Sequence, residues 1–121
     1  MEGMLTVSVF MILGAVRGDS ELGLWKAARI GDLANVNSTL STGVNPNWRN
    51  GDNHGETALH AAAAYNHPKV VSALLQAGAD KDLRDDFGMT PIRVASTFGQ
   101  TEAITVLIDH GADVDIPAYY G

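Results

Sequence analysis

Two stretches of this chain repeat each other at a spacing of 33 residues, and this period constrains the fold more than any other feature. The first stretch, GETALHAAA, begins at Gly55, and the second, GMTPIRVAS, begins at Gly88. The match continues through the Gly-Ala-Asp runs at 78–80 and 111–113. A period of this length predicts an array of stacked supersecondary units, each packed on its neighbours.

A weaker copy of the same unit lies upstream at an offset of 35 residues, where Leu24 matches Leu59 and Val36 matches Val71. Three units are therefore expected within one domain's length of chain. The predicted boundaries are a degenerate first unit at 19–54, a second unit at 55–87, a third unit at 88–120, and Gly121 as the first residue of an unfinished unit.

Each unit is expected to form two short helices followed by a turn-rich loop. Thr57 and Thr90 stand before apolar runs, where a threonine hydroxyl can cap a helix N terminus. Pro68 opens a second run whose apolar residues recur at helical spacing. Aspartate-rich segments then favour turns, and Asn50-Gly51 suits a tight hairpin turn in the first loop. The pattern predicts an all-α fold of helix pairs with projecting loops.

The segments GETALHAAAAYNHPKVVSALLQAGADKD and GMTPIRVASTFGQTEAITVLIDHGADVD resemble the ankyrin repeat, which opens with Thr-Pro-Leu-His and closes with Gly-Ala-Asp. The resemblance implies an ankyrin-repeat α-solenoid of stacked helix-turn-helix units with β-hairpin-like loops. It also implies that His60 forms hydrogen bonds to neighbouring loops, and that the small alanines after it let the next repeat pack closely. Ala58 replaces the family's proline, and Trp25 and Arg93 replace its histidine. The first unit also lacks the Thr-Pro cap, so it resembles an N-terminal capping repeat.

Residues 1–18 are an apolar segment outside these units. Met4–Val16 holds thirteen residues of which two are polar, too few to span a hydrocarbon core of roughly 30 Å. The segment is either an N-terminal extension or a signal peptide, since small residues at Val16 and Gly18 suit a cleavage site. Glu2 and the lack of lysine or arginine before Met4 count against a signal. We expect a cytoplasmic protein, or a secreted one if this segment is cleaved.

The charge of the chain restricts its partners. Its formal net charge is −6, and residues 55–121 carry nine acidic and four basic side chains. Such an acidic surface repels phosphate backbones, so nucleic acid is not expected as a partner. Acidic groups beside aromatic ones favour a protein partner with a basic or amide-rich segment. We expect the chain itself to be a monomer.

No motif for catalysis, a cofactor or a metal stands out. The chain has no cysteine, which excludes disulfides, zinc thiolate sites and thiol catalysis. Its four histidines do not form a His-Glu-x-x-His motif, and it has no Gly-x-Ser-x-Gly motif. The segment ADKDLRDD lacks the glycine and glutamate of a calcium-binding EF-hand loop. We expect a non-enzymatic protein-interaction module; the alternative is the substrate-recognition part of a longer enzyme or effector.

The family resemblance implies a partner-binding surface on the concave face, formed by loop tips and the ends of the first helices. The helix ends would contribute one stripe of Ile30, Tyr65 and Phe98. The loop tips would add Asn53, His54, Glu56, Asp86, Phe87, Met89, Tyr119 and Tyr120. Exposed aromatic and methionine side chains suit such a surface. In the alternative interpretation, Phe87 and Phe98 tuck between repeats and serve the core.

Overall fold

The computed structural model describes residues 20–118. Its helices in chain order are α2 (Glu21–Ile30), α3 (Leu33–Leu40), a short 3₁₀ turn η1 (Gly51–Asn53), α4 (Ala58–Ala64), α5 (Pro68–Gln76), α6 (Pro91–Thr97) and α7 (Thr101–Asp109). They pack as the pairs α2–α3, α4–α5 and α6–α7, which confirms the predicted all-α array. The predicted extension or signal peptide at 1–18 lies outside the described residues.

Threonine caps begin the first helix of the second and third units, as predicted. Thr57 Oγ1 accepts a hydrogen bond from the backbone N–H of His60, and Thr90 Oγ1 accepts one from Arg93. Pro91 then occupies the first turn of α6, where its missing N–H costs no intrahelical bond. The α-helices are only seven to ten residues long. Helices this short depend on packing for their stability.

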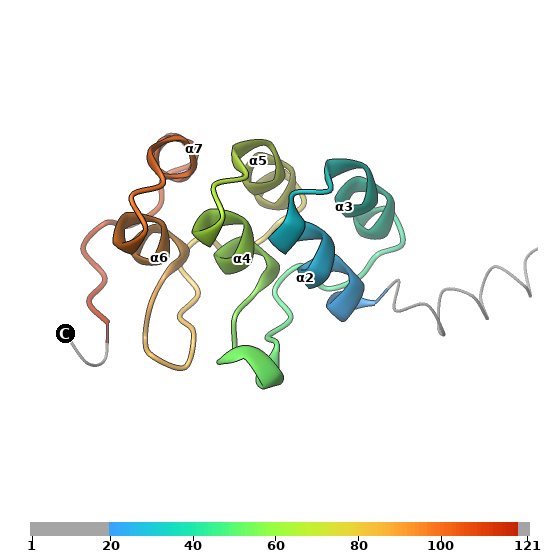
Figure 1. The fold of residues 1–121 in the computed structure, drawn as a ribbon, viewed down its shortest axis with the longest axis horizontal. Helices are drawn as coiled ribbons and strands as arrows, with labels where there is room; N and C mark the ends of the chain where they lie inside the picture. Colours follow the sequence, from blue (N-terminus) through green and yellow to red (C-terminus); the bar gives the residue numbers. More distant parts are fainter. Residues whose placement is uncertain (1–19, 119–121) are drawn as a thin grey trace, which may run out of the picture.

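The helices form two layers (Figure 1). Helices α2, α4 and α6 lie side by side in one row, which we call the inner helices, and α3, α5 and α7 form the other row, the outer helices. The alanines at 61–63 are fully buried, and their small side chains let α2 and α6 approach α4 from both sides. The larger buried side chains include Leu59, Leu74 and Leu107. The core therefore runs as a continuous strip along the array.

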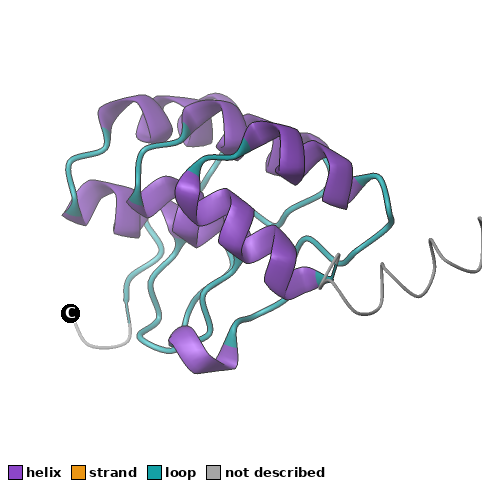
Figure 2. Cartoon of the chain, turned by 45° about the vertical axis from the view of Figure 1, so that its right-hand side comes forward, coloured by secondary structure: helices purple, strands orange, loops and turns teal. Residues whose placement is uncertain are grey.

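The long loops that join successive helix pairs project from one side of the array (Figure 2). In the first loop, Asn50 and Glu56 form an isolated antiparallel bridge, with 2.8 Å from Asn50 N to Glu56 O. The tight Asn-Gly hairpin turn predicted at 50–51 is wrong, because Gly51 begins η1 and the left-handed conformation occurs later, at His54. The Asn50 side chain accepts a hydrogen bond from Asp52 N and so caps the 3₁₀ turn instead.

Equivalent polar contacts tie each helix pair to the next. His67 Nε2 lies 3.0 Å from the carbonyl oxygen of Arg29, and the side-chain amide of Gln100 donates to the carbonyl of Ala64 at 2.7 Å. His67 and Gln100 are the N-cap residues of α5 and α7. Their acceptors lie in the last turn of the inner helix of the preceding repeat, α2 for Arg29 and α4 for Ala64. Equivalent sequence positions in successive repeats therefore make equivalent hydrogen bonds.

Within residues 20–118, the last helix pair, α6–α7, borders a cavity of about 530 Å³. Its lining residues are Ile92, Arg93, Ser96, Thr97, Ile104, Ile108 and Val114. Ile108 is 51% exposed, whereas its equivalent Leu75 packs against the core. The third unit thus presents apolar side chains that the second unit buries.

Candidate functional site

The helix-end side chains predicted to face a partner are exposed. Ile30 is the last residue of α2, and Tyr65 and Phe98 directly follow α4 and α6. Their exposed fractions are 70%, 52% and 63%. Because the three inner helices lie in one row (Figure 1), these side chains occupy successive positions along it. The interpretation that Phe98 tucks between repeats is wrong, since most of its side chain is exposed.

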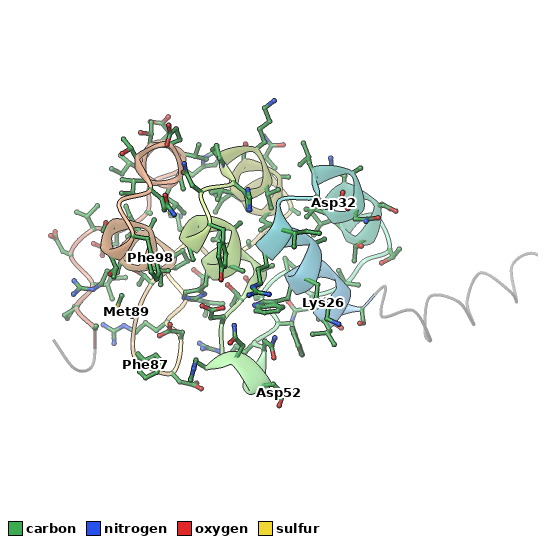
Figure 3. All side chains as sticks on the ribbon, viewed as in Figure 1. Lys26, Asp32, Asp52, Phe87, Met89 and Phe98 are labelled. Atoms are coloured by element: carbon green, nitrogen blue, oxygen red, sulfur yellow. The ribbon has the colours of Figure 1, made fainter. Side chains whose placement is uncertain are left out.

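The tips of the two projecting loops contact each other. The rings of His54 and Phe87 lie with their centroids 5.0 Å apart, and Asp86 N donates to the carbonyl of His54 at 2.9 Å. Phe87 is nearly half exposed and lies at the far end of its loop, below Phe98 in Figure 3, so it does not serve the core. Met89 is only partly exposed, and its carbonyl binds the ring of His60.

A pocket of about 520 Å³ lies between the inner helices and the first loop. It is lined by Trp25, Arg29, Asn53, Glu56, Ala64, Tyr65, Phe98 and Gln100, and we call it the aromatic pocket. Four of the predicted site residues therefore come together in it: Asn53, Glu56, Tyr65 and Phe98. The others lie elsewhere, namely Ile30, His54, Asp86, Phe87 and Met89. Tyr119 and Tyr120 lie outside the described residues.

The aromatic pocket contains an internal cation that sequence reasoning missed. The guanidinium carbon of Arg29 lies 5.4 Å from the ring centroid of Tyr65 and 5.8 Å from that of Trp25. Arg29 Nη2 also donates to Tyr65 Oη across 3.5 Å, which is a long hydrogen bond. Trp25 and Arg29 come from α2 in the first repeat, and Tyr65 follows α4 in the second. The repeat alignment marks Arg29 and Trp25 as motif positions, and stacking the first unit on the second is what brings them to Tyr65.

Glu56 places a carboxylate in the wall of the same pocket. Burial raises the pKa of Glu56, and the nearby negative charge of Asp85 raises it further. A hydrogen bond from Asn53 Nδ2 to Glu56 Oε2, at 2.7 Å, opposes this shift, as does the charge of His54. The carboxylate is therefore partly desolvated beside aromatic rings, an environment in which a cation stabilises it more than at an open surface.

His60 has a structural role, as the family resemblance implies. Its ring is fully buried. The backbone N–H of Thr57 donates to Nδ1, so the proton of the neutral ring is on Nε2, which donates to the carbonyl of Met89 at 2.8 Å. This bond joins the start of α4 to the next projecting loop. Burial lowers the pKa of His60, in opposition to the Met89 carbonyl and the charge of Asp85, while Arg49 lowers it further.

Residues 20–118 contain neither a metal-binding cluster nor a helix that could span a membrane. No group of three or more histidine, aspartate or glutamate side chains there lies close enough together to hold a metal ion. Among the described helices, none is both long and apolar enough to cross a bilayer. The aromatic pocket thus offers aromatic rings, two side-chain amides, one guanidinium and one carboxylate.

Comparison with known proteins gives consistent matches. The family model described as ankyrin repeats (3 copies) matches residues 24–118. The chain is 45% identical over 60 residues to ankyrin repeat domain-containing protein 40 of Mus musculus, covering 50% of this chain and 16% of that protein. It is 39% identical over 64 residues to ankyrin repeat domain-containing protein 39 of Homo sapiens, covering 53% of this chain and 34% of that protein.

A third relative is not named after its ankyrin repeats. The mitochondrial disaggregase of Bos taurus is 44% identical to this chain over 64 residues, which cover 53% of this chain and 9% of that protein. In all three comparisons the chain spans about a third or less of the relative's length. The matches thus concern the repeats themselves, and the rest of each relative has no counterpart in the alignment.

Proposed function

The chain belongs to the ankyrin-repeat family, and on that premise we propose that it is a non-enzymatic module that binds a partner protein on its concave face. Ankyrin repeats are generally protein-interaction modules. The observation that carries the proposal for this chain is the exposure of Tyr65, Phe98 and Phe87 on the side of the inner helix ends and projecting loops. Large aromatic side chains at such positions supply contact area that packing of the repeats does not use.

The charge supports a basic or amide-rich segment in the partner. The chain carries a formal charge of −6, and Glu56 and Asp86 lie on or near the proposed surface. Complementary charge speeds the encounter of two proteins and disfavours acidic competitors. The buried Asp85, in contrast, is occupied within its own loop, where its carboxylate accepts hydrogen bonds from Phe87 N and Met89 N.

A double substitution tests the proposal. Peptides that bind the chain are first selected from a displayed random-sequence library, and their affinities are then measured for Tyr65→Ala combined with Phe87→Ala. We expect binding to weaken by about 2 kcal/mol or more, as for aromatic anchors. The melting midpoint should stay nearly unchanged, because both side chains lie outside the buried core.

The matched control is Ile108→Ala, which removes an equally exposed apolar side chain from the end of the array. It should leave binding unchanged. If the double variant instead loses stability, and binding falls only in proportion to the unfolded fraction, then Tyr65 and Phe87 are structural residues and the proposal is wrong.

A second candidate function is substrate recognition within a longer enzyme or effector. One observation favours it: the mitochondrial disaggregase of Bos taurus carries a similar segment in 9% of its length. In this case the same concave face would bind the substrate of a catalytic domain outside these residues. Fusing the chain to an unrelated catalytic domain should then direct that domain to the library-selected peptides.

A further inference from the structure

The aromatic pocket already binds a guanidinium group, that of the chain itself. Arg29 lies within cation–π distance of both Trp25 and Tyr65. The face of a ring that attracts one guanidinium will attract another, because the interaction depends on the ring's quadrupole and the planar cation. The pocket therefore has the chemistry to receive an arginine side chain.

The internal guanidinium is held loosely. Arg29 is exposed at the end of α2, and its hydrogen bond to Tyr65 Oη is long and lies at the exposed surface. An exposed side chain of this kind can swing into water at little cost, since solvent replaces a weak bond and a solvent-exposed stack. Tyr65 is 52% exposed and its ring is thus within reach of a competing group, whereas Trp25 is 8% exposed, so a competitor reaches its ring only once Arg29 has moved away.

The pocket also holds a negative charge, that of Glu56. Glu56 is partly desolvated and close to the negative charge of Asp85. A cation brought beside Glu56 would relieve both the desolvation and the repulsion between the two acids. Phe98, 63% exposed, adds a further ring at the pocket edge. A neutral amide would gain the contact with the rings but not the attraction to Glu56.

We propose that the aromatic pocket binds an arginine side chain of the partner, and that this side chain displaces Arg29 from the rings of Trp25 and Tyr65. This inference rests on the proposed function and adds the chemistry of the anchoring residue. Arginine is favoured over lysine because its planar guanidinium can stack on a ring and still donate to a carboxylate. Arg29 is then an internal competitor that the partner must replace.

Two small probes test this directly: N-acetyl-arginine amide and N-acetyl-citrulline amide, which has nearly the same shape without the charge. Binding is followed by NMR on the indole N–H signal of Trp25, assigned with the variant Trp48→Phe. We expect the arginine probe to shift this signal and to bind about tenfold more tightly than the citrulline probe, as a charged pair in a partly buried site should.

Three variants locate the interaction. Glu56→Gln should weaken arginine binding about fivefold, whereas Glu102→Gln, which removes the same charge from exposed α7, should change it less than about twofold. Arg29→Gln should strengthen arginine binding about threefold, because it removes the competitor and a like charge. Far-UV circular dichroism confirms that each variant is folded.

Equal binding of the arginine and citrulline probes would overturn the proposal, as would no shift of the Trp25 signal with either probe. Weaker arginine binding in Arg29→Gln would overturn the displacement of Arg29. These outcomes are separate from the proposed function. Library-selected peptides that need Tyr65 but contain no arginine would reject the anchor and keep the concave face, whereas an absence of peptides that need Tyr65 would reject the face itself.

Discussion

The second and third repeats have nearly the same backbone but different surroundings. The pair α4–α5 contacts helix pairs on both sides, whereas among the described residues α6–α7 has a neighbouring pair only on the α4–α5 side. Leu75 packs against the core, while its equivalent Ile108 is 51% exposed and lines the cavity of about 530 Å³ beside α6 and α7. The comparison shows that in such an array burial depends on the neighbour as much as on the residue's own hydrophobicity.

The largest expected effect is the contrast between truncations at Leu59 and at its equivalent Ile92; both side chains are buried, but only Ile92 lines this cavity. Leu59→Ala should lower the free energy of unfolding by about 3 kcal/mol, because the surrounding repeats cannot collapse into the space. Ile92→Ala removes the same number of carbon atoms but should cost only about half as much, since Ile92 already borders a cavity. Urea denaturation measures both. Equal losses would mean that the end of the array is as tightly packed as its middle.

A second effect concerns the contact between repeats made by His60. Its ring bonds the Met89 carbonyl of the next loop. His60→Ala removes this bond and also the acceptor for Thr57 N, so we expect the free energy of unfolding to fall by about 2 kcal/mol. Urea denaturation measures the loss. An unchanged free energy of unfolding would mean that this bond between repeats contributes nothing to stability.

The same histidine makes stability depend on pH. Burial holds the pKa of His60 below its ordinary value, so the unfolded chain binds more protons than the folded chain once the pH falls below about 6.5. The contribution of neutral His60 to the free energy of unfolding is fully present above that pH, and it is lost as the pH falls toward the lowered pKa of His60. Stability measured between pH 7 and 5 should therefore decrease in the parent chain more steeply than in His60→Ala.

The repeat made much of this architecture predictable. The spacing located the helix pairs, and Thr57 and Thr90 gave the starts of α4 and α6, because a cap is a local interaction. The exposure of Tyr65 and Phe98 followed from their shared position at helix ends. Each of these features depends on residues close in sequence or related by the period.

The aromatic pocket could not be predicted in the same way. It depends on side-chain contacts between repeats, such as Arg29 over Tyr65, in which one partner belongs to the degenerate first unit. The Asn50-Gly51 turn was wrong for a related reason: the dipeptide favours a hairpin, but the Asn50 side chain caps a 3₁₀ turn within a loop fixed at both ends by helices. In both cases the structure depends on contacts between residues far apart in sequence, which a local motif does not contain.

The finest test of the comparison uses two glycines at equivalent turns. Gly31 and Gly99 both have positive φ, 80° and 67°, so alanine at either position is strained by about 1 kcal/mol. A Cβ at Gly31 would also lie 2.5 Å from the ring of His67 in the next repeat, whereas at Gly99 nothing lies within 4 Å. Gly31→Ala should therefore cost about 1 kcal/mol more than Gly99→Ala in thermal unfolding. Adding His67→Ala should remove this excess in the Gly31 variant and leave the Gly99 variant's own strain unchanged. If the excess persists without the imidazole, the difference arises within the turn, and the neighbouring repeat is not its cause.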